Sequence, residues 1–260
     1  MSRLESLHIE FQSPRSRPDP DNRRPTPLTR HVLHFLVWWE FKGVHEYLED
    51  VMAWIDAPHL SELSTFFFMD LDFHVPQLHR FIGHSEELKK LKRASIAFTQ
   101  GYVTVTLAQF TVNFVQLLLQ IRCQESDWLL STMAQVFHSS LPPFSSLEEL
   151  VINDKSPDHQ QPHWKDDMES TQWLELLDPF ATVKDLYLSK GVALRLEHAL
   201  QELDWERVAE VLPALQNIFV EDLEPSGLDQ ADLGKLVAAR QLSSHPVAIH
   251  RWGPEGSLHL

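Results

Sequence analysis

The feature that most constrains this fold is an apolar pattern that returns along the 260-residue chain. Each unit joins two apolar anchors to a stretch of alternating apolar residues, as in Leu4-x-x-Leu7-x-Ile9-x-Phe11. The second anchors of the first four units are spaced by 29, 27 and 28 residues. Leucine-rich repeats have a period of about 20–29 residues and the pattern L-x-x-L-x-L. Further units begin at Leu33, Leu60, Leu88, Leu147, Val183 and Leu212, with a weaker copy at Leu117 and a last strand at Val247–Ile249.

Between these predicted strands the apolar period lengthens from 2 to about 3.6 residues, which is typical of helices. Residues 45–55 place Leu48, Val51, Met52 and Ile55 on one face, and residues 127–141, 194–212 and 228–242 follow the same pattern. The sequence therefore predicts an α/β fold, a leucine-rich-repeat-like solenoid or horseshoe with a parallel concave sheet and helices on its convex side.

The repeat units share one predicted core, so we expect residues 1–252 to form a single domain with a tail over 253–260. Two segments interrupt the pattern. A Pro/Arg-rich loop is predicted over 13–28, and a polar insertion over 153–168.

Charge and composition argue against several classes of protein. Asp and Glu outnumber Lys and Arg by 37 to 22, so the formal charge of −15 disfavours nucleic acid as a partner. The single Cys123 excludes an intrachain disulfide and a cysteine-based zinc site. Because neither a signal peptide nor an apolar run of about 18 residues is found, we expect a cytoplasmic or nuclear protein without a membrane contact.

The sequence contains no phosphate-binding loop, dinucleotide fingerprint or nucleophile elbow, so we expect no cofactor and no enzymatic activity. The densest cluster of candidate metal ligands is Asp158–Asp167, which includes His159 and His163. Pro162 lies between the two histidines and opposes the helix that would align them on a metal ion. A polar, solvated loop is the favoured interpretation, and a metal-dependent hydrolase is the less favoured alternative.

The concave face of the predicted sheet is the better candidate for a binding surface. In a strand, the residue between two buried anchors points to the opposite face. The row predicted in this way contains His8 and Ala97 and the candidate partner-binding residues Glu40, Phe67, Leu118, Val151, Tyr187 and Phe219. From Leu118 to Phe219 the row is apolar or aromatic, which is typical of a partner site. The alternative is that loops cover the row or that the strand register differs, because a slip of one residue inverts every side chain.

Several stretches resemble the leucine-rich-repeat region of F-box and F-box-like proteins of mushroom-forming fungi. The resemblance spans nearly the whole chain, and its motifs are mostly structural. They are residues 3–12 with the loop to Pro27, then 40–44, 55–60, 140–143, 172–177, 186–190, 212–217 and 237–242.

The resemblance implies the substrate-binding repeat region of a receptor for cullin-type ubiquitin ligases. The helical F-box is missing ahead of Leu4, so binding of the ligase adaptor is expected only if an F-box exists upstream.

From the residues we expect a non-enzymatic domain that recognises a protein through its concave face. Its acidic character favours a basic target. The alternative is a structural or scaffolding repeat module without a selected ligand.

Overall fold

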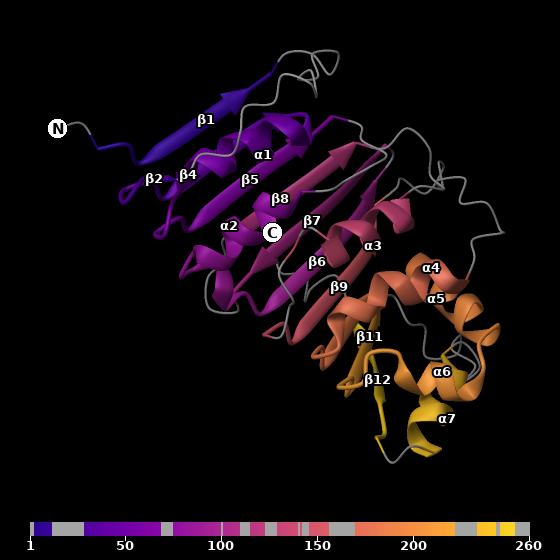
Figure 1. Ribbon diagram of the computed structural model, residues 1–260. Coiled ribbons are helices and arrows are strands. Elements are labelled where there is room, and N and C mark those ends of the chain that lie inside the picture. The colour runs from indigo at the N-terminus through magenta and orange to yellow at the C-terminus, as the bar shows by residue number, and fades with distance from the viewer. Residues whose placement is uncertain are drawn as a thin grey trace.

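The computed structural model is mixed α/β and is built around one large sheet (Figure 1). It describes residues 3–11, 29–68, 75–99, 101–109, 115–122, 129–139, 141, 146–155, 170–221, 233–242 and 245–252. In sheet order, the ten strands are β1 (Ser6–Glu10), β3 (Trp38–Gly43), β5 (Glu62–Phe67), β8 (Val115–Arg122), β7 (Tyr102–Ala108), β6 (Arg93–Thr99), β9 (Glu149–Asp154), β10 (Asp185–Leu188), β11 (Asn217–Glu221) and β12 (Ala248–Trp252). A second, two-stranded sheet pairs β2 (His31–Val32) with β4 (Ile55–Asp56).

The sheet is mostly parallel, and it departs from the expected parallel sheet at one strand. β7 runs antiparallel to both of its neighbours, β6 and β8. The turn between β6 and β7 contains Gly101, whose φ of 79° lies in the left-handed region that glycine enters without strain. Because of this double hairpin, β5 pairs with β8 and β6 pairs with β9. Sheet order therefore differs from chain order in the middle of the sheet.

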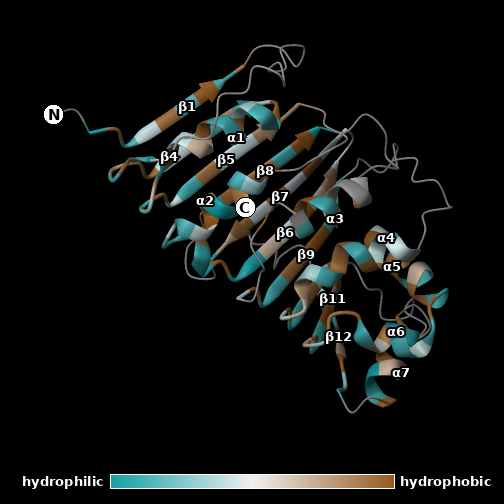
Figure 2. Cartoon of the chain, in the orientation of Figure 1, coloured by the Kyte–Doolittle hydropathy of each residue, from teal (hydrophilic) through white to brown (hydrophobic). Residues whose placement is uncertain are grey.

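Helices connect most of the parallel strands and pack against the sheet (Figure 1). Figure 2 shows that helices such as α2 and α7 carry both hydrophilic and hydrophobic residues, as packing on a sheet requires. The helix expected over 194–212 is two helices, α5 and α6. The bounds are α1 (His45–Trp54), α2 (Pro76–His84), α3 (Leu129–Ser139), α4 (Ser170–Leu177), α5 (Lys190–Gln201), α6 (Trp205–Glu210) and α7 (Gly234–Leu242), with short 3₁₀ turns η2 (Leu88–Lys90) and η4 (Asp178–Phe180).

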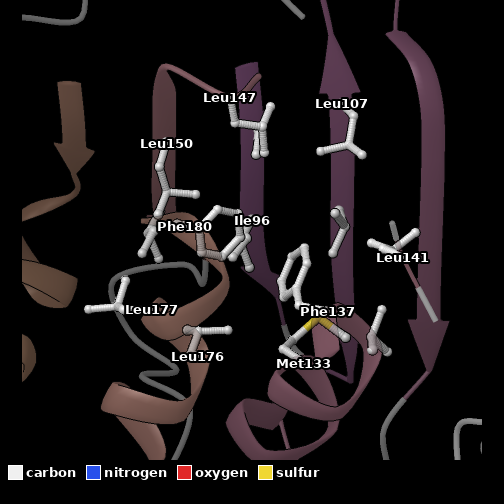
Figure 3. Close-up of a cluster of buried hydrophobic side chains, with 14 of the residues drawn as sticks. Ile96, Leu107, Met133, Phe137, Leu141, Leu147, Leu150, Leu176, Leu177 and Phe180 are labelled. Carbon is white, nitrogen blue, oxygen red and sulfur yellow. The ribbon is translucent and has the colours of Figure 1, made fainter. Parts of the chain in front are cut away.

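The core lies between the helices and one face of the sheet. Alternate strand residues such as Trp39, Leu63 and Ile96 are fully buried and join helix residues in one hydrophobic cluster. Within it the rings of Phe137 and Phe180 meet edge to face with centroids 4.8 Å apart. Figure 3 shows this part of the core, where α3 and α4 meet β6, β7 and β9. The residues labelled there are Ile96, Leu107, Met133, Phe137, Leu141, Leu147, Leu150, Leu176, Leu177 and Phe180.

The predicted irregular segments fall mostly outside the described residues. The Pro/Arg-rich loop over 13–28 lies there, as do residues 156–168 of the predicted insertion. The start of that insertion is wrong, because Asn153 and Asp154 belong to β9. Among the described helices, none is long and apolar enough to cross a bilayer.

Candidate functional site

The face of the ten-stranded sheet opposite the helices is here called the open face. Strand residues that alternate with the buried core residues point to it. Strand register aligns one such residue from each strand in a single row across the sheet, the central row. In sheet order it consists of His8, Glu40, Ser64, Leu118, Thr106, Ser95, Val151, Tyr187, Phe219 and His250.

Four of the six candidate binding residues lie in the central row and retain solvent-accessible surface. They are Glu40, Leu118, Tyr187 and Phe219. His8, which the same pattern predicted, is also in the row and is exposed. For these positions, the alternation of buried anchors and intervening residues in the sequence correctly predicts that the side chain lies on the open face.

Phe67 is a wrong prediction, because it is fully buried on the helix side of β5. The pattern placed Phe66 and Phe68 inward, whereas the inward residues of β5 are Leu63, Thr65 and Phe67. Thr65 is a polar residue at an inward position, where its hydroxyl donates to the carbonyl of Leu118 at 3.2 Å. Because a polar residue occupies a core position, the apolar alternation of this strand is not visible in the sequence. The predicted assignment of faces is therefore off by one residue.

Val151 is on the open face as predicted but offers no binding surface, because only 2% of it is exposed. The side chain of Arg93 reaches from β6 across β9, and its guanidinium lies 6.0 Å from the ring of Tyr187 on β10. In the central row Val151 is flanked by Ser95 on β6 and Tyr187 on β10. Ala97 is also on the open face, one row farther along β6, and Ser95 takes its expected place beside Val151.

Aromatic rings gather at the β10–β12 end of the open face. The rings of Tyr187 and Phe219 stack almost in parallel, with centroids 4.4 Å apart and an angle of 8°. His250 continues the stack on the far side of Phe219 at 5.0 Å. Trp252 meets Tyr187 at 71°, with centroids 5.6 Å apart. These four residues, from three neighbouring strands, are called the aromatic strip below.

A polar row runs beside the aromatic strip, two residues earlier in each strand. Arg93, Glu149, Asp185 and Asn217 are register partners across β6, β9, β10 and β11. The Arg93 Nε lies 3.6 Å from Glu149, and the Asn217 amide donates to the Asp185 carboxylate at 2.7 Å. The side-chain amide oxygen of Asn217 (Oδ1) lies 3.2 Å from the His250 Nε2. The contact between Asn217 and His250 thus links the polar row to the strip, and the other two contacts hold the row together.

The polar row contains two carboxylates, Glu149 and Asp185, and one cation, Arg93. Burial raises the pKa of Glu149, and the neighbouring carboxylates Asp185 and Glu148 raise it further, while Arg93 lowers it. Burial also raises the pKa of the Tyr187 hydroxyl, with Glu149 and Asp185 contributing in the same direction. The strip is therefore a set of planar rings beside an incompletely neutralised acidic pair.

A second aromatic group lies nearer the middle of the open face, on β5 and β7, and has a cation over each of its rings. The rings of Phe66 and Tyr102 are 5.8 Å apart. Lys42 lies over Phe66 and Arg122 over Tyr102, each at 5.9 Å from the ring centroid. Both rings of this group have a cation partner within the chain, whereas Arg93 lies over one ring of the aromatic strip, that of Tyr187.

Sequence reasoning missed much of the aromatic strip. His250 and Trp252 follow the predicted strand Val247–Ile249, and extending its alternation by three residues would have placed both on the open face. Arg93, Asp185 and Asn217 precede the apolar residues of their strands, where the repeat pattern carries no information.

The candidate metal ligands His159 and His163 lie outside the described residues, and so does Cys123. Across the described ranges, no group of three His, Cys, Asp or Glu side chains is placed to hold a metal ion. The described open face instead offers ring stacking, carboxylates and a fixed amide, which are means of binding.

A scan against protein-family models matches none of them, and searches of the curated proteins and of the solved structures likewise return no match. The interpretation of the open face therefore rests on its geometry.

Proposed function

We propose that this chain is a non-enzymatic recognition domain that binds a partner protein through the open face of its sheet. The observation that carries this proposal is the aromatic strip, above all the stacked pair of Tyr187 and Phe219, on a face that the described helices leave uncovered. Large aromatic rings supply much of the binding energy of protein interfaces, because they bury a large area with few rotatable bonds.

The strip is also suited to binding by its rigidity. Tyr187 is held by Phe219, Trp252 and Arg93, and Phe219 is held on its other side by His250. A surface that is already ordered loses little conformational entropy when a partner binds. The core is packed on the opposite face of the sheet, so substitutions in the strip should not disrupt the fold.

We further propose that the parallel runs β1-β3-β5 and β9-β10-β11-β12 are units of a leucine-rich-repeat-like solenoid. Within each run chain order and sheet order agree, as repeat stacking requires. The resemblance in sequence then makes the domain the substrate-binding repeat region of an F-box-type ubiquitin-ligase receptor. In that role the open face holds the protein to be modified.

The experiment is selection of binders from a random peptide display library on the immobilised wild-type domain. The enriched peptides are then titrated against the double variant Tyr187→Ser/Phe219→Ser. Loss of the two anchors should weaken binding at least about tenfold, as expected for interface hot spots. The matched control is Trp205→Ser, which removes an exposed ring from α6 (52% accessible) and should leave binding unchanged.

Unfolding midpoints in urea show whether the double variant is folded, and we expect them to change little. Enriched peptides that bind the double variant as tightly as wild type, or a library that yields no binder, would contradict the proposal.

A further inference from the structure

The polar row beside the aromatic strip holds two carboxylates that face each other directly. Glu149 and Asp185 are register partners on the neighbouring parallel strands β9 and β10, and both lie on the open face. Neighbouring strands are about 4.8 Å apart, so two like charges at opposed positions repel each other. One cation reduces this repulsion in the described residues, and it approaches from the β6 side, where Arg93 lies 3.6 Å from Glu149.

Among the described residues, no cation forms an ion pair with Asp185, and the adjacent Lys184 pairs with Glu148 instead. Asp185 contacts the Asn217 amide, which donates to one carboxylate oxygen at 2.7 Å. The orientation of that amide is consistent with its second contact, because its carbonyl oxygen is 3.2 Å from the His250 Nε2. Asn217 therefore fixes the position of Asp185 while leaving its second oxygen available as an acceptor.

Arg93 shows how a guanidinium is accommodated at this place. It pairs with Glu149 and at the same time lies 6.0 Å from the Tyr187 ring, so it uses the acidic row and the strip together. A planar guanidinium combines such contacts better than an ammonium does, because it binds carboxylates with two parallel donors and lies flat on apolar surface.

We propose that the open face recognises a basic partner segment, and that Asp185, with Glu149 beside it, accepts the guanidinium of an arginine in that segment while the segment's apolar atoms lie on the aromatic strip. This rests on the proposed function and names the chemistry of its partner. The overall charge of −15 acts in the same direction, since an acidic domain attracts basic segments over a longer range. Asn217 is a positioning residue in this arrangement.

The test uses peptides enriched on the wild-type domain. They should contain arginine, and replacing the critical arginine by citrulline, its neutral isostere, should weaken binding about tenfold, as loss of a charge-assisted pair does. Against the Asp185→Asn variant the same replacement should change affinity less than about twofold, because this variant lacks the carboxylate that pairs with the positive charge of the arginine. Asp178→Asn, at an exposed carboxylate of η4, is the matched control and should retain the full citrulline penalty.

The outcomes separate the two proposals. Peptides that need Tyr187 and Phe219 but contain no arginine, or whose citrulline penalty is equal on wild type and Asp185→Asn, overturn the arginine inference and leave the proposed function standing. A selection without any strip-dependent binder overturns both. An Asn217→Ala variant adds a second readout: affinity for the arginine peptide should fall while affinity for its citrulline form stays constant.

Discussion

The Glu49 carboxylate of α1 accepts the backbone N–H of Gln77 at the start of α2, with 2.8 Å between its Oε2 and the nitrogen. Its Oε1 accepts the N–H of Leu78 at 3.1 Å. The first N–H groups of a helix have no acceptor within that helix, so Glu49 supplies one from a neighbouring element. Burial nevertheless dominates and raises the pKa of Glu49 to about 7.

This carboxylate predicts a defined pH dependence of stability. Below pH 4.5, the ordinary pKa, both the folded and unfolded states hold the Glu49 proton, and between 4.5 and about 7 only the folded state does. The free energy of unfolding therefore falls as pH rises through this window, by roughly 3 kcal/mol from this group. In Glu49→Gln the decrease between pH 4.5 and 8 should be smaller by that amount in urea titrations. An equal decrease in wild type and Glu49→Gln would contradict the assignment, and Glu202→Gln, at an exposed site, should behave as wild type.

The register of β5 is tested by two adjacent phenylalanines. Phe67 is fully buried, so Phe67→Ala should lower the free energy of unfolding by about 3–5 kcal/mol. Phe66 lies on the open face with Tyr102 and Lys42, so Phe66→Ala should lower it by only about 1 kcal/mol. Chemical denaturation of both variants gives the comparison. A larger loss of stability in Phe66→Ala than in Phe67→Ala would contradict this register and support the one expected from sequence, in which Phe66 is buried.

Arg240 holds the turn after α6. It is 2% exposed on α7, and its guanidinium donates to the carbonyls of Val211, Leu212 and Pro213. Leu212 has φ of 51°, an uncommon conformation for a bulky residue that this contact fixes in place. Arg240→Met keeps the apolar stem and removes the donors, and should lower stability by about 2–3 kcal/mol. Arg251→Met, at an exposed position of β12, should leave the unfolding midpoint unchanged, and a similar loss in both variants would refute the role of Arg240.

Two glycines predict stability changes of opposite sign. Gly101, with φ of 79°, turns the chain between β6 and β7, and Gly101→Ala should destabilise by about 1 kcal/mol. Gly83 lies within α2, where a methyl group would meet no atom within 4 Å. Gly83→Ala should therefore stabilise by about 0.5–1 kcal/mol. Thermal unfolding of the two variants distinguishes these effects, and changes of the same sign would be inconsistent with the two backbone conformations.

Periodic residues made most of the strands and helices predictable from sequence. Strong alternation around Trp39 and Phe41, and around Leu186 and Leu188, gives the correct faces. Where polar or bulky residues interrupt the alternation, as at Thr65 between Phe66 and Leu63, the local pattern no longer determines the face. The partners of each strand depend on distant residues, so the β5–β8 and β6–β9 pairings carried no local signal.

The candidate site divides in the same way. Tyr187 and Phe219 were predictable, because each lies between two buried apolar residues of its own strand. The burial of Val151 was not, since it depends on side chains of the neighbouring strands rather than on the sequence around Val151. The Asp185–Asn217 hydrogen bond likewise depends on register between strands rather than on local sequence.

The antiparallel strand β7 also governs the order in which the sheet can assemble. In a linear repeat array each unit contacts only its neighbours, so folding can start anywhere and spread. Here β5 ends at Phe67 and its partner strand begins only at Val115. The two parallel runs therefore join only after β6, β7 and β8 have closed into hairpins, which are local and fast to form. Cooperative folding of the whole sheet thus depends on this central module, and a chain without it would have two separate sheets, each with an additional open edge.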